Sequence, residues 1–554
     1  MKGIKNFKRS NRKYLALLMA ALTAAASLSV KSNRSSLSVF TSIAPPGLRA
    51  HMYSSQSSSA KTENNGSGAA GSVLRVGRTW DSGSGNFDPA TFSGISFQFG
   101  PDVFESLLTY NDKQEPAPYL AESWETSDDL KTYTFKLREG VQFHYGFGEM
   151  KASDVVFSVG RLLDPAINNT ATNSTNLGLA NIESVEAADD YTVVFTLKEG
   201  DVFFPDKVAR SYLTITSQKA VEEMGLEEYQ KRPIGTGPFM LEEGGVPGEK
   251  YCTVKFDDYW GQKAKLDRVE YYVIPDDVTL ANAMEAGEID TYDVNNLEKV
   301  EEYMADPDTY VLLNARDSAQ SYIGINANFE PLNDPKVREA IALSIDRDMV
   351  CDEYFKGTEE KSKGFLPTFC RYALEDYWNP EYNPEKAKQL LAEAGYPDGF
   401  AIDMYAPNDT LSAGPATLVQ QFLTQIGLKV DLQTVDFGVW LDKAKAGEIP
   451  IYLFWDSCPV IPDNVLKQFT SESTINYIAY NDPEYDRIVA AAVEENDLAK
   501  KAELYNEAQK NIMDSGCLYT MTTYSIHQVV NPRVKDLKIT TGLMLTCREA
   551  YIEE

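Results

Sequence analysis

Alternating apolar and polar residues mark the clearest strand of this chain. Within residues 132–137 the side chains of Tyr133, Phe135 and Leu137 alternate with polar ones, which predicts a half-buried strand followed by a turn at Arg138–Gly140. Further strands are expected where β-branched and aromatic residues gather. These are Leu74–Gly77, Tyr191–Leu197, Val254–Phe256 and Val269–Ile274.

Apolar residues at helical spacing predict helices in the second half of the chain. Within Asp334–Phe355, the residues Val337, Ile341 and Ile345 recur every four positions, which predicts a pair of helices, and Asp346 can cap the second one. Other helices are expected at Val278–Gly287, Asn383–Gly395, Ala416–Gly427 and Pro483–Asn511. Strands and helices mixed in this way indicate α/β domains.

Length and charge limit the possible partners. The chain has 554 residues, which gives room for about three to four domain-sized units. Its formal net charge of -30 repels nucleic acid and anionic lipid, so we expect neither as a direct partner. The charge keeps a soluble protein dispersed, and the alternative is that it attracts cationic ligands.

Histidine and cysteine usage argues against a metal centre or a cofactor. The three histidines, His51, His144 and His527, lie far apart, so a histidine-rich metal cage is not expected. The six cysteines show no C-x-x-C spacing, which excludes zinc knuckles and dithiol redox motifs. Disulfides are possible outside the cell, with Cys351 and Cys370 the nearest pair in sequence, and free buried cysteines are the alternative.

The N-terminus has the pattern of an export signal. Basic residues in 1–13 precede the apolar run Tyr14–Val30, so we expect residues 1–30 to be a signal peptide, with an uncleaved membrane anchor as the alternative. Residues 31–72 are expected to form a flexible linker. No cysteine precedes Cys252, so a lipid anchor is not supported, and a reading-frame shift across residues 31–53 is one hypothesis for a lost lipobox cysteine. We expect the protein in the periplasm or at the outer face of the cytoplasmic membrane.

Nine short fragments recur in a fixed order between residues 87 and 395. They are Phe87–Pro89, Phe104–Leu108, Ala121–Trp124 (with Thr132–Gly140 after it), Ala152–Ser158, Gly235–Phe239, Tyr259–Gly261, Gly287–Asp290, Asp334–Asp348 and Lys386–Gly395. Each fragment is weak by itself, but in this order they resemble the family 5 extracytoplasmic solute-binding proteins, and the similarity extends from Val73 to the C-terminus. These proteins are the peptide, nickel and oligosaccharide receptors of ABC importers.

The resemblance implies an α/β fold, namely a two-lobed, type II periplasmic-binding-protein-like clamp that closes about a two-segment hinge. Lobe I would span residues 73–310, with an extra subdomain at about 100–230, and the return segment 521–554. Lobe II would span 311–520. The hinge would lie near Leu312–Tyr322 and Leu518–Tyr524. The family implies a monomer that performs no catalysis and delivers its ligand to the permease subunits of an ABC transporter.

The family's peptide receptors carry a Gly-Trp-x-x-Asp motif whose aspartate pairs with the peptide's amino group. Here Trp455 matches the tryptophan, but Cys458 occupies the aspartate position, and a thiol does not replace a carboxylate at neutral pH. Asp456 takes that role only if the loop is re-routed. Tyr452 stands at an upstream position that is often basic. A peptide or peptide-like solute is the main expectation, and an oligosaccharide or a metal chelate are the alternatives.

Other candidate ligand-binding residues have structural alternatives. Phe92 and Ser93 lie at a position where family members bind the ligand through backbone groups, and a plain structural loop is the alternative. Tyr405 and Asn408 follow a predicted strand, so they are expected either to face the cleft or to belong to a solvated loop. Trp440 is expected either to stack on the ligand or to lie in the core.

Two other functions are the alternatives to transport. An enzyme would need a thiol–imidazole pair such as Cys458 with His527. The sequence contains no nucleophile-elbow or metalloprotease motif that would support one. A sensor or adhesin would reuse the same clamp.

Overall fold

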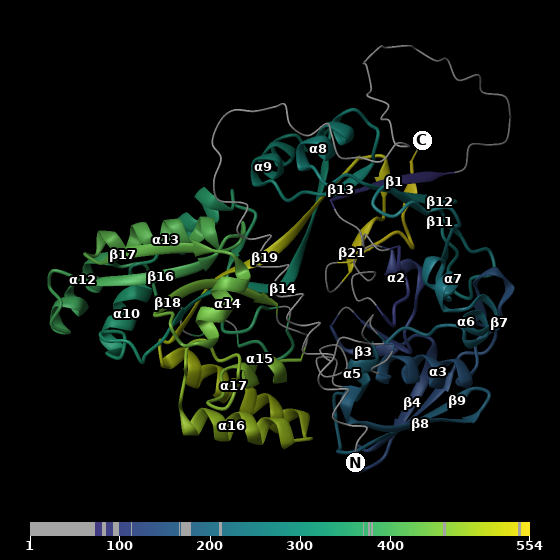
Figure 1. Ribbon diagram of the computed structural model, residues 1–554, viewed down its shortest axis with the longest axis horizontal. Helices are drawn as coiled ribbons and strands as arrows, with labels where there is room; N and C mark the ends of the chain where they lie inside the picture. The colour runs from purple at the N-terminus through teal and green to yellow at the C-terminus, as the bar shows by residue number, and fades with distance from the viewer. Residues whose placement is uncertain are drawn as a thin grey trace, which may run out of the picture. The chain divides into compact units, whose positions relative to one another are not determined.

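The structure is a computed structural model (Figure 1). It describes residues 72–79, 85–91, 99–111, 113–164, 167, 179–209, 213–368, 370–374, 377, 380–457, 461–540 and 544–553. The expected signal peptide, nearly all of the expected linker, and the candidates Phe92, Ser93 and Cys458 lie outside these residues. Within them, no helix is both long and apolar enough to cross a bilayer.

A mixed sheet of eleven strands runs through the described part of the chain. Its order is β10 (Phe239–Leu241), β11 (Lys250–Lys255), β12 (Arg268–Val273), β1 (Val73–Arg78), β13 (Thr291–Asp293), β19 (Leu518–Val530), β14 (Val311–Ile325), β18 (Ile451–Ser457), β16 (Ala401–Pro407) and β17 (Lys429–Val435). Strand β15 (Glu360–Lys361) pairs with β19 outside this path. The four strands expected from the β-branched runs appear here and in the subdomain sheet described below.

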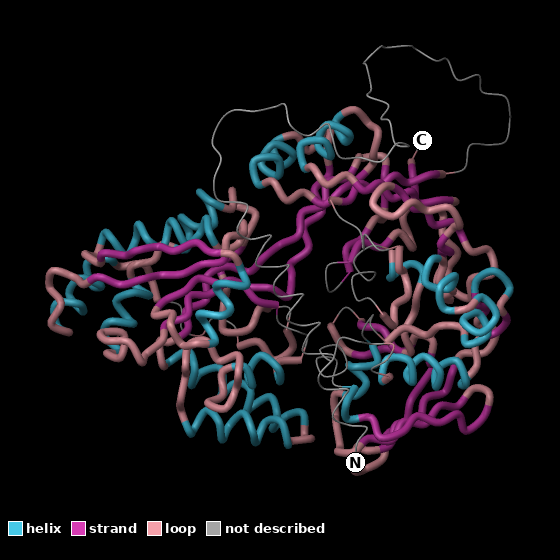
Figure 2. Tube along the Cα trace, in the orientation of Figure 1, coloured by secondary structure: helices cyan, strands magenta, loops and turns pink. Residues whose placement is uncertain are grey.

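The long strands β14 and β19 carry the chain across the middle of this sheet. They have 15 and 13 residues and pair antiparallel, with shifts of register between Arg316 and Gln320 and between Gln320 and Tyr322. In Figure 2 they are the long magenta segments that run through the middle of the molecule. Both expected hinge segments fall on these strands. We call residues 72–310 and 531–553 the first lobe, and residues 326–517 the second lobe. The exact lobe limits stay a prediction.

The second lobe packs helices around β16, β17 and β18. It contains α10 (Pro335–Leu343), α11 (Arg347–Met349), a π-helical turn (Val350–Tyr354), α12 (Pro384–Glu393), α13 (Ala413–Gln425), α14 (Phe437–Lys445), α15 (Asp463–Gln468), α16 (Pro483–Glu494) and α17 (Leu498–Asp514). Two apolar cores lie here, one around Ile451 and Leu453 and the other around Tyr452 and Trp440.

A separate core defines the inserted subdomain, which we take as residues 107–234. Its sheet has the order β4 (Ala121–Thr126), β5 (Thr132–Leu137), β9 (Thr192–Leu197) and β8 (Ile182–Asp189). Tyr133, Phe135 and Leu137 are buried and their neighbours are not, so the predicted alternation is confirmed. The helices are α3 (Ala152–Leu163), α5 (Phe204–Ala209), α6 (Gln218–Met224) and α7 (Leu226–Lys231).

The remaining elements are short and belong mainly to the first lobe and the edges of the subdomain. They are α2 (Gly100–Val103), β2 (Leu108–Tyr110), β3 (Pro116–Pro118), β6 (Gln142–Phe143), η2 (His144–Gly146), β7 (Gly148–Glu149), η3 (Leu179–Asn181), α8 (Asp277–Glu285), α9 (Leu297–Ala305), β20 (Val534–Lys535), β21 (Lys538–Thr540), β22 (Met544–Thr546) and β23 (Tyr551–Ile552).

Helix caps explain where the predicted helices begin. Asp346 accepts a hydrogen bond from the Met349 amide at 3.0 Å, so its predicted role as a cap is confirmed. The expectation of one helical stretch over Pro483–Asn511 is wrong in part. The helix ends at Glu494, and Asp497 caps a second one, because its carboxylate accepts from the backbone amides that open α17.

Several of the sequence fragments meet around the buried carboxylate of Glu105. It accepts hydrogen bonds from the Thr236 hydroxyl at 2.9 Å, the Tyr259 hydroxyl at 2.8 Å and the Trp260 indole at 2.8 Å. The Arg548 guanidinium from the C-terminal segment lies 2.9 Å away. A buried charge with this many partners is a structural tie, so these fragments hold the first lobe together.

The five described cysteines are buried, and no disulfide joins any two of them: Cys252, Cys351, Cys370, Cys517 and Cys547. The possible disulfide between Cys351 and Cys370 is therefore not formed.

Candidate functional site

The strands of the second lobe place their carboxyl ends at one edge of the sheet, which we call the carboxyl edge. β16 runs parallel to β17 on one side and to β18 on the other. The chain passes from β16 to β17 through α13 and from β17 to β18 through α14, so the two connections run in opposite directions (Figure 1). In open α/β sheets, ligands bind outside the carboxyl ends of the strands at such a reversal.

The end of β18 separates from β16 at this edge. β18 pairs with β16 only at Met404 and Tyr405, whereas it pairs with β14 as far as Ser457. Trp455 and Asp456 therefore lie beyond the residues of β18 that pair with β16. The structure thus brings three predicted candidates, Tyr405, Trp455 and Asp456, to the same edge.

Trp455 and Asp456 point to opposite faces of the sheet, because neighbouring side chains on a strand alternate. Ile451 and Leu453 belong to one core of the second lobe and Tyr452 to the other. Asp456 lies on the face of Tyr452, and Trp455 on the face of Leu453.

The negative charge of Asp456 acts on a group of tyrosines. Burial raises the pKa of Tyr322, Tyr452 and Tyr477, and the charge of Asp456 raises the pKa of each of them further. Asp456 itself is half-buried. A partly desolvated carboxylate among aromatic rings attracts a cationic group more strongly than an exposed one does.

Trp440 lies in the core, and its neighbour Phe437 is the accessible ring. Trp440 has no exposed surface, while Phe437 is 52% exposed. The rings of Trp440 and Phe454 lie 4.5 Å apart and nearly parallel, and the Phe437 ring stacks 6.0 Å from that of Trp440. Of the two alternatives for Trp440, the structure therefore shows the core position. The available signal for Phe437 was its position directly after β17 and the N-cap Asp436.

The other described candidates have structural contacts. Tyr452 is fully buried, and its ring lies so close to Gly324 that a Cβ there would come within 2.2 Å of it. Tyr405 is half-buried, with the Lys443 ammonium 5.6 Å from its ring. Asn408 is exposed, and its backbone amide donates to the Val435 carbonyl at 2.8 Å. Asn408 therefore fixes the loop after β16 through its backbone.

His527 lies between polar side chains of neighbouring strands. Its Nδ1 lies 2.9 Å from the Asn314 side-chain oxygen, and its Nε2 lies 3.7 Å from the Glu359 carboxylate. All three residues lie on or beside β14 and β19. His527 therefore belongs to the packing of the two long strands.

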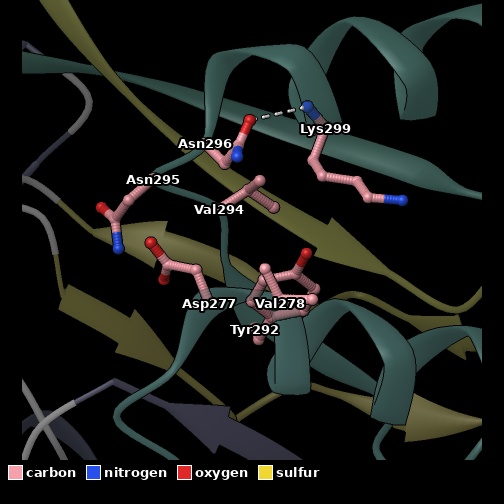
Figure 3. A pocket seen from close by; sticks show the side chains of 7 residues that line it. All are labelled: Asp277, Val278, Tyr292, Val294, Asn295, Asn296 and Lys299. Carbon is pink, nitrogen blue, oxygen red and sulfur yellow. Dashed lines mark hydrogen bonds between the residues drawn. The ribbon is translucent and has the colours of Figure 1, made fainter.

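A small hollow lies away from these residues, where β13 ends and α8 and α9 begin (Figure 3). One of its polar groups caps α9: the Asn296 side chain accepts from the amides of Glu298 and Lys299 at 2.9 and 3.2 Å. Tyr292 and Val294 form its apolar wall. None of the residues predicted to bind the ligand lines this hollow. Within the described residues, no cluster of His, Cys, Asp and Glu suits a metal ion.

Comparison with known proteins gives consistent matches. Residues 115–477 match the model of the bacterial extracellular solute-binding proteins, family 5. The chain is 31% identical over 481 residues to heme-binding protein A of Haemophilus influenzae, which covers 81% of this chain and 87% of the relative.

Solved structures match over a similar length. HbpA2 from Haemophilus parasuis superposes with a TM-score of 0.79 at 26% identity, covering 87% of this chain and all of that one. The periplasmic binding protein DppA from Helicobacter pylori, in complex with the peptide STSA, superposes with a TM-score of 0.67 at 28% identity. It covers 87% of this chain and 98% of that one. These neighbours have the two-lobed clamp fold, which confirms the predicted fold class.

Proposed function

The chain belongs to family 5 of the bacterial extracellular solute-binding proteins, and from this premise we propose that it captures a short peptide and delivers it to the permease of an ABC importer. The observation that carries the proposal is the match to a peptide-bound neighbour over 87% of this chain. The carboxyl edge with Asp456 supports it, because a free peptide carries the ammonium group that such a carboxylate attracts.

In this proposal Asp456 holds the peptide's amino group from a position two residues before the usual one. A buried ammonium needs a charged partner, since an unpaired ion in a closed site costs several kcal/mol. Phe437 offers an exposed ring on which an apolar side chain of the peptide packs. The core rings of Trp440 and Phe454 support Phe437 from behind. Closure of the lobes then removes the peptide from water.

Isothermal titration calorimetry tests this recognition with a panel of dipeptides and their N-acetylated forms. Acetylation removes the ammonium, so we expect binding only by the free dipeptides. Asp456→Asn should weaken that binding by about thirtyfold, which corresponds to about 2 kcal/mol for a hydrogen bond to a charged group. Asp403→Asn is the matched control, because Asp403 is exposed on β16. Equal binding by blocked and free peptides would refute the role of Asp456.

The same proposal places the protein outside the cytoplasm. Residues 1–30 would direct export and be removed, and residues 31–72 would form a tether. The mature protein would act as a monomer and perform no turnover. Mass spectrometry of the secreted protein tests the export step, with a new N-terminus expected close to residue 30.

A metal chelate is the second candidate ligand, because one of the most similar relatives is a heme-binding protein by name. Aromatic rings such as Phe437 also suit a flat macrocycle. Titration with hemin separates the two candidates. A saturable shift of the Soret band at one equivalent favours the chelate, and its absence together with peptide binding favours the peptide.

A further inference from the structure

Two neighbouring phenylalanines of the inserted subdomain enter different cores. Phe204 belongs to the core of the subdomain itself, where its ring lies 4.9 Å from Tyr133 and 5.2 Å from Phe195. Phe203 is also buried, but its partners belong to a core of the second lobe. Two consecutive residues of the chain therefore pack into two different cores.

The segment that carries Phe203 is firmly attached to the subdomain. The Tyr133 hydroxyl donates to the Asp201 carbonyl at 2.6 Å, and the Tyr110 hydroxyl donates to the Asp206 carbonyl at 3.0 Å. Residues 201–206 thus present Phe203 as a fixed projection. In Figure 1, α5 lies on the side of the subdomain that faces α15 and α17.

The second lobe receives this projection with two cations and an aromatic ring. The guanidinium of Arg371 lies 5.5 Å from the centre of the Phe203 ring, and the ammonium of Lys501 lies 5.2 Å from it. The ring of Tyr372 is 6.1 Å away. Such cation–π contacts become stronger where water is excluded.

An ion pair between the two lobes completes the contact. Arg371 pairs with the carboxylate of Asp206, whose side chain is only 3% exposed. Burial lowers the pKa of the Lys501 ammonium, and the charges of Asp463 and of Asp201 in the subdomain raise it. The subdomain therefore supplies an apolar ring and negative charge to a surface that offers positive charge.

The receiving surface is held rigidly within the second lobe. Lys501 donates to the carbonyls of Ala492 and Val493 at 2.5 and 3.2 Å. Tyr372 adopts a φ of 68°, which is unfavourable for an aromatic residue, and Gln509 holds this turn by donating to the Tyr372 carbonyl at 2.8 Å. Strained turns of this kind persist where surrounding contacts over-determine them.

We propose that residues 201–206 and the loop of Arg371 form a latch that holds the two lobes closed, also in the ligand-free protein. The proposal rests on the clamp function proposed above. The contact is made of side chains, whereas the hinge is made of paired backbone, so the latch releases without breaking the sheet. Its free energy sets the balance between open and closed forms, and through that balance the apparent affinity for any ligand.

Small-angle scattering of the full-length, ligand-free protein tests the latch. We expect Phe203→Ala, Asp206→Arg and Arg371→Asp each to increase the radius of gyration, and the double variant with Asp206→Arg and Arg371→Asp to restore the wild-type value. Lys136→Ala is the matched control, because Lys136 donates to the Thr192 hydroxyl inside the subdomain sheet. Unchanged circular dichroism confirms that each variant is folded.

Hydrogen exchange gives a second measurement, which remains interpretable if one of the variants folds poorly. Backbone amides of 201–209 and 371–374 should exchange faster in Phe203→Ala than in the wild type. Identical scattering and exchange for the wild type, Phe203→Ala and Arg371→Asp would overturn the proposal, as would a double variant that resembles the single reversals. No peptide is needed, so a failure of the peptide proposal leaves this result intact.

Discussion

The inserted subdomain is held on two sides, and the two sides are built differently. Toward the first lobe, a buried ion pair joins Asp88 to Arg161, and His144 joins the subdomain to the backbone of Gly235 and Gly237. Toward the second lobe, side chains around Phe203 make the contact. The first side loses buried hydrogen bonds if it opens, whereas the second loses packing and one ion pair.

This difference indicates which boundary moves. Breaking the first side leaves buried charges without partners, which costs several kcal/mol and resembles unfolding. Breaking the second side exposes Phe203 and lets Arg371 and Asp206 become hydrated. The subdomain should therefore move with the first lobe as one body and detach only from the second lobe.

The largest contrast is expected between the two neighbouring phenylalanines. Phe204→Ala removes a ring from a core that exists in the open and the closed form, so the free energy of unfolding should fall by about 4 kcal/mol. Phe203→Ala can cost no more than the free energy of closing, which we expect to be below about 2 kcal/mol. Urea denaturation of both variants measures the difference. Equal losses would mean that both sides of the subdomain are fixed.

The ion pair of the fixed side should matter nearly as much. Arg161→Met leaves the fully buried carboxylate of Asp88 without its cation and should lower the free energy of unfolding by about 3 kcal/mol. Thermal unfolding monitored by circular dichroism measures this loss. Arg487→Met is the control, because Arg487 forms an exposed pair with Glu484. A loss of unfolding free energy as small as that of the control would indicate that the boundary between the subdomain and the first lobe can also open.

The histidine of the fixed side should give the protein a pH-dependent stability. Burial lowers the pKa of His144 to about 4, although the Gly237 carbonyl and the charge of Glu105 favour its protonated form. The Gly235 amide donates to Nδ1 at 3.3 Å, so a proton on Nδ1 would oppose that donor. Between pH 6.5 and 4 the unfolded chain binds a proton that the folded chain does not.

The contribution of His144 is therefore complete above pH 6.5 and falls as the pH approaches 4, by about 3 kcal/mol in total. His144→Gln offers a donor and an acceptor without titrating. The stability of this variant should depend less steeply on pH across that window. Parallel pH profiles for the variant and the wild type would contradict this assignment.

The smallest effect on stability is expected at the releasable side. Arg371→Ala removes the partner of Asp206, but opening of the latch lets the carboxylate reach water. We expect a loss below about 1 kcal/mol in the free energy of unfolding, as for an exposed pair. Urea denaturation at low and high salt measures it. A loss close to that of Arg161→Met would remove the distinction between the two sides.

Those parts of the fold that depend on residues close together in the sequence were predictable. The alternation in β5 and the cap Asp346 depend on neighbours in sequence, and the structure has them as expected. The break between α16 and α17 was missed, although Asp497 is a strong N-cap, because the apolar spacing continues on both sides. At this position a single capping residue indicates a break, whereas the longer periodic spacing of apolar residues indicates one continuous helix.

The carboxyl edge was only partly predictable. The match of Trp455 and its neighbours to a family motif directed attention to β18, but the choice between Trp440 and Phe437 depends on which ring the rest of the lobe covers. The destination of Phe203 depends on Arg371 and Lys501, which are far away in the sequence. Side chains that meet only in the folded protein leave no pattern in one sequence.

Native mass spectrometry of the protein purified from cells that export it tests the central claim, that a peptide is captured at the carboxyl edge. We predict a bound mass in the range of di- to pentapeptides, which is absent from Asp456→Asn and retained in Asp403→Asn. A sugar or porphyrin mass would contradict the claim, and so would a peptide mass that survives in Asp456→Asn unchanged.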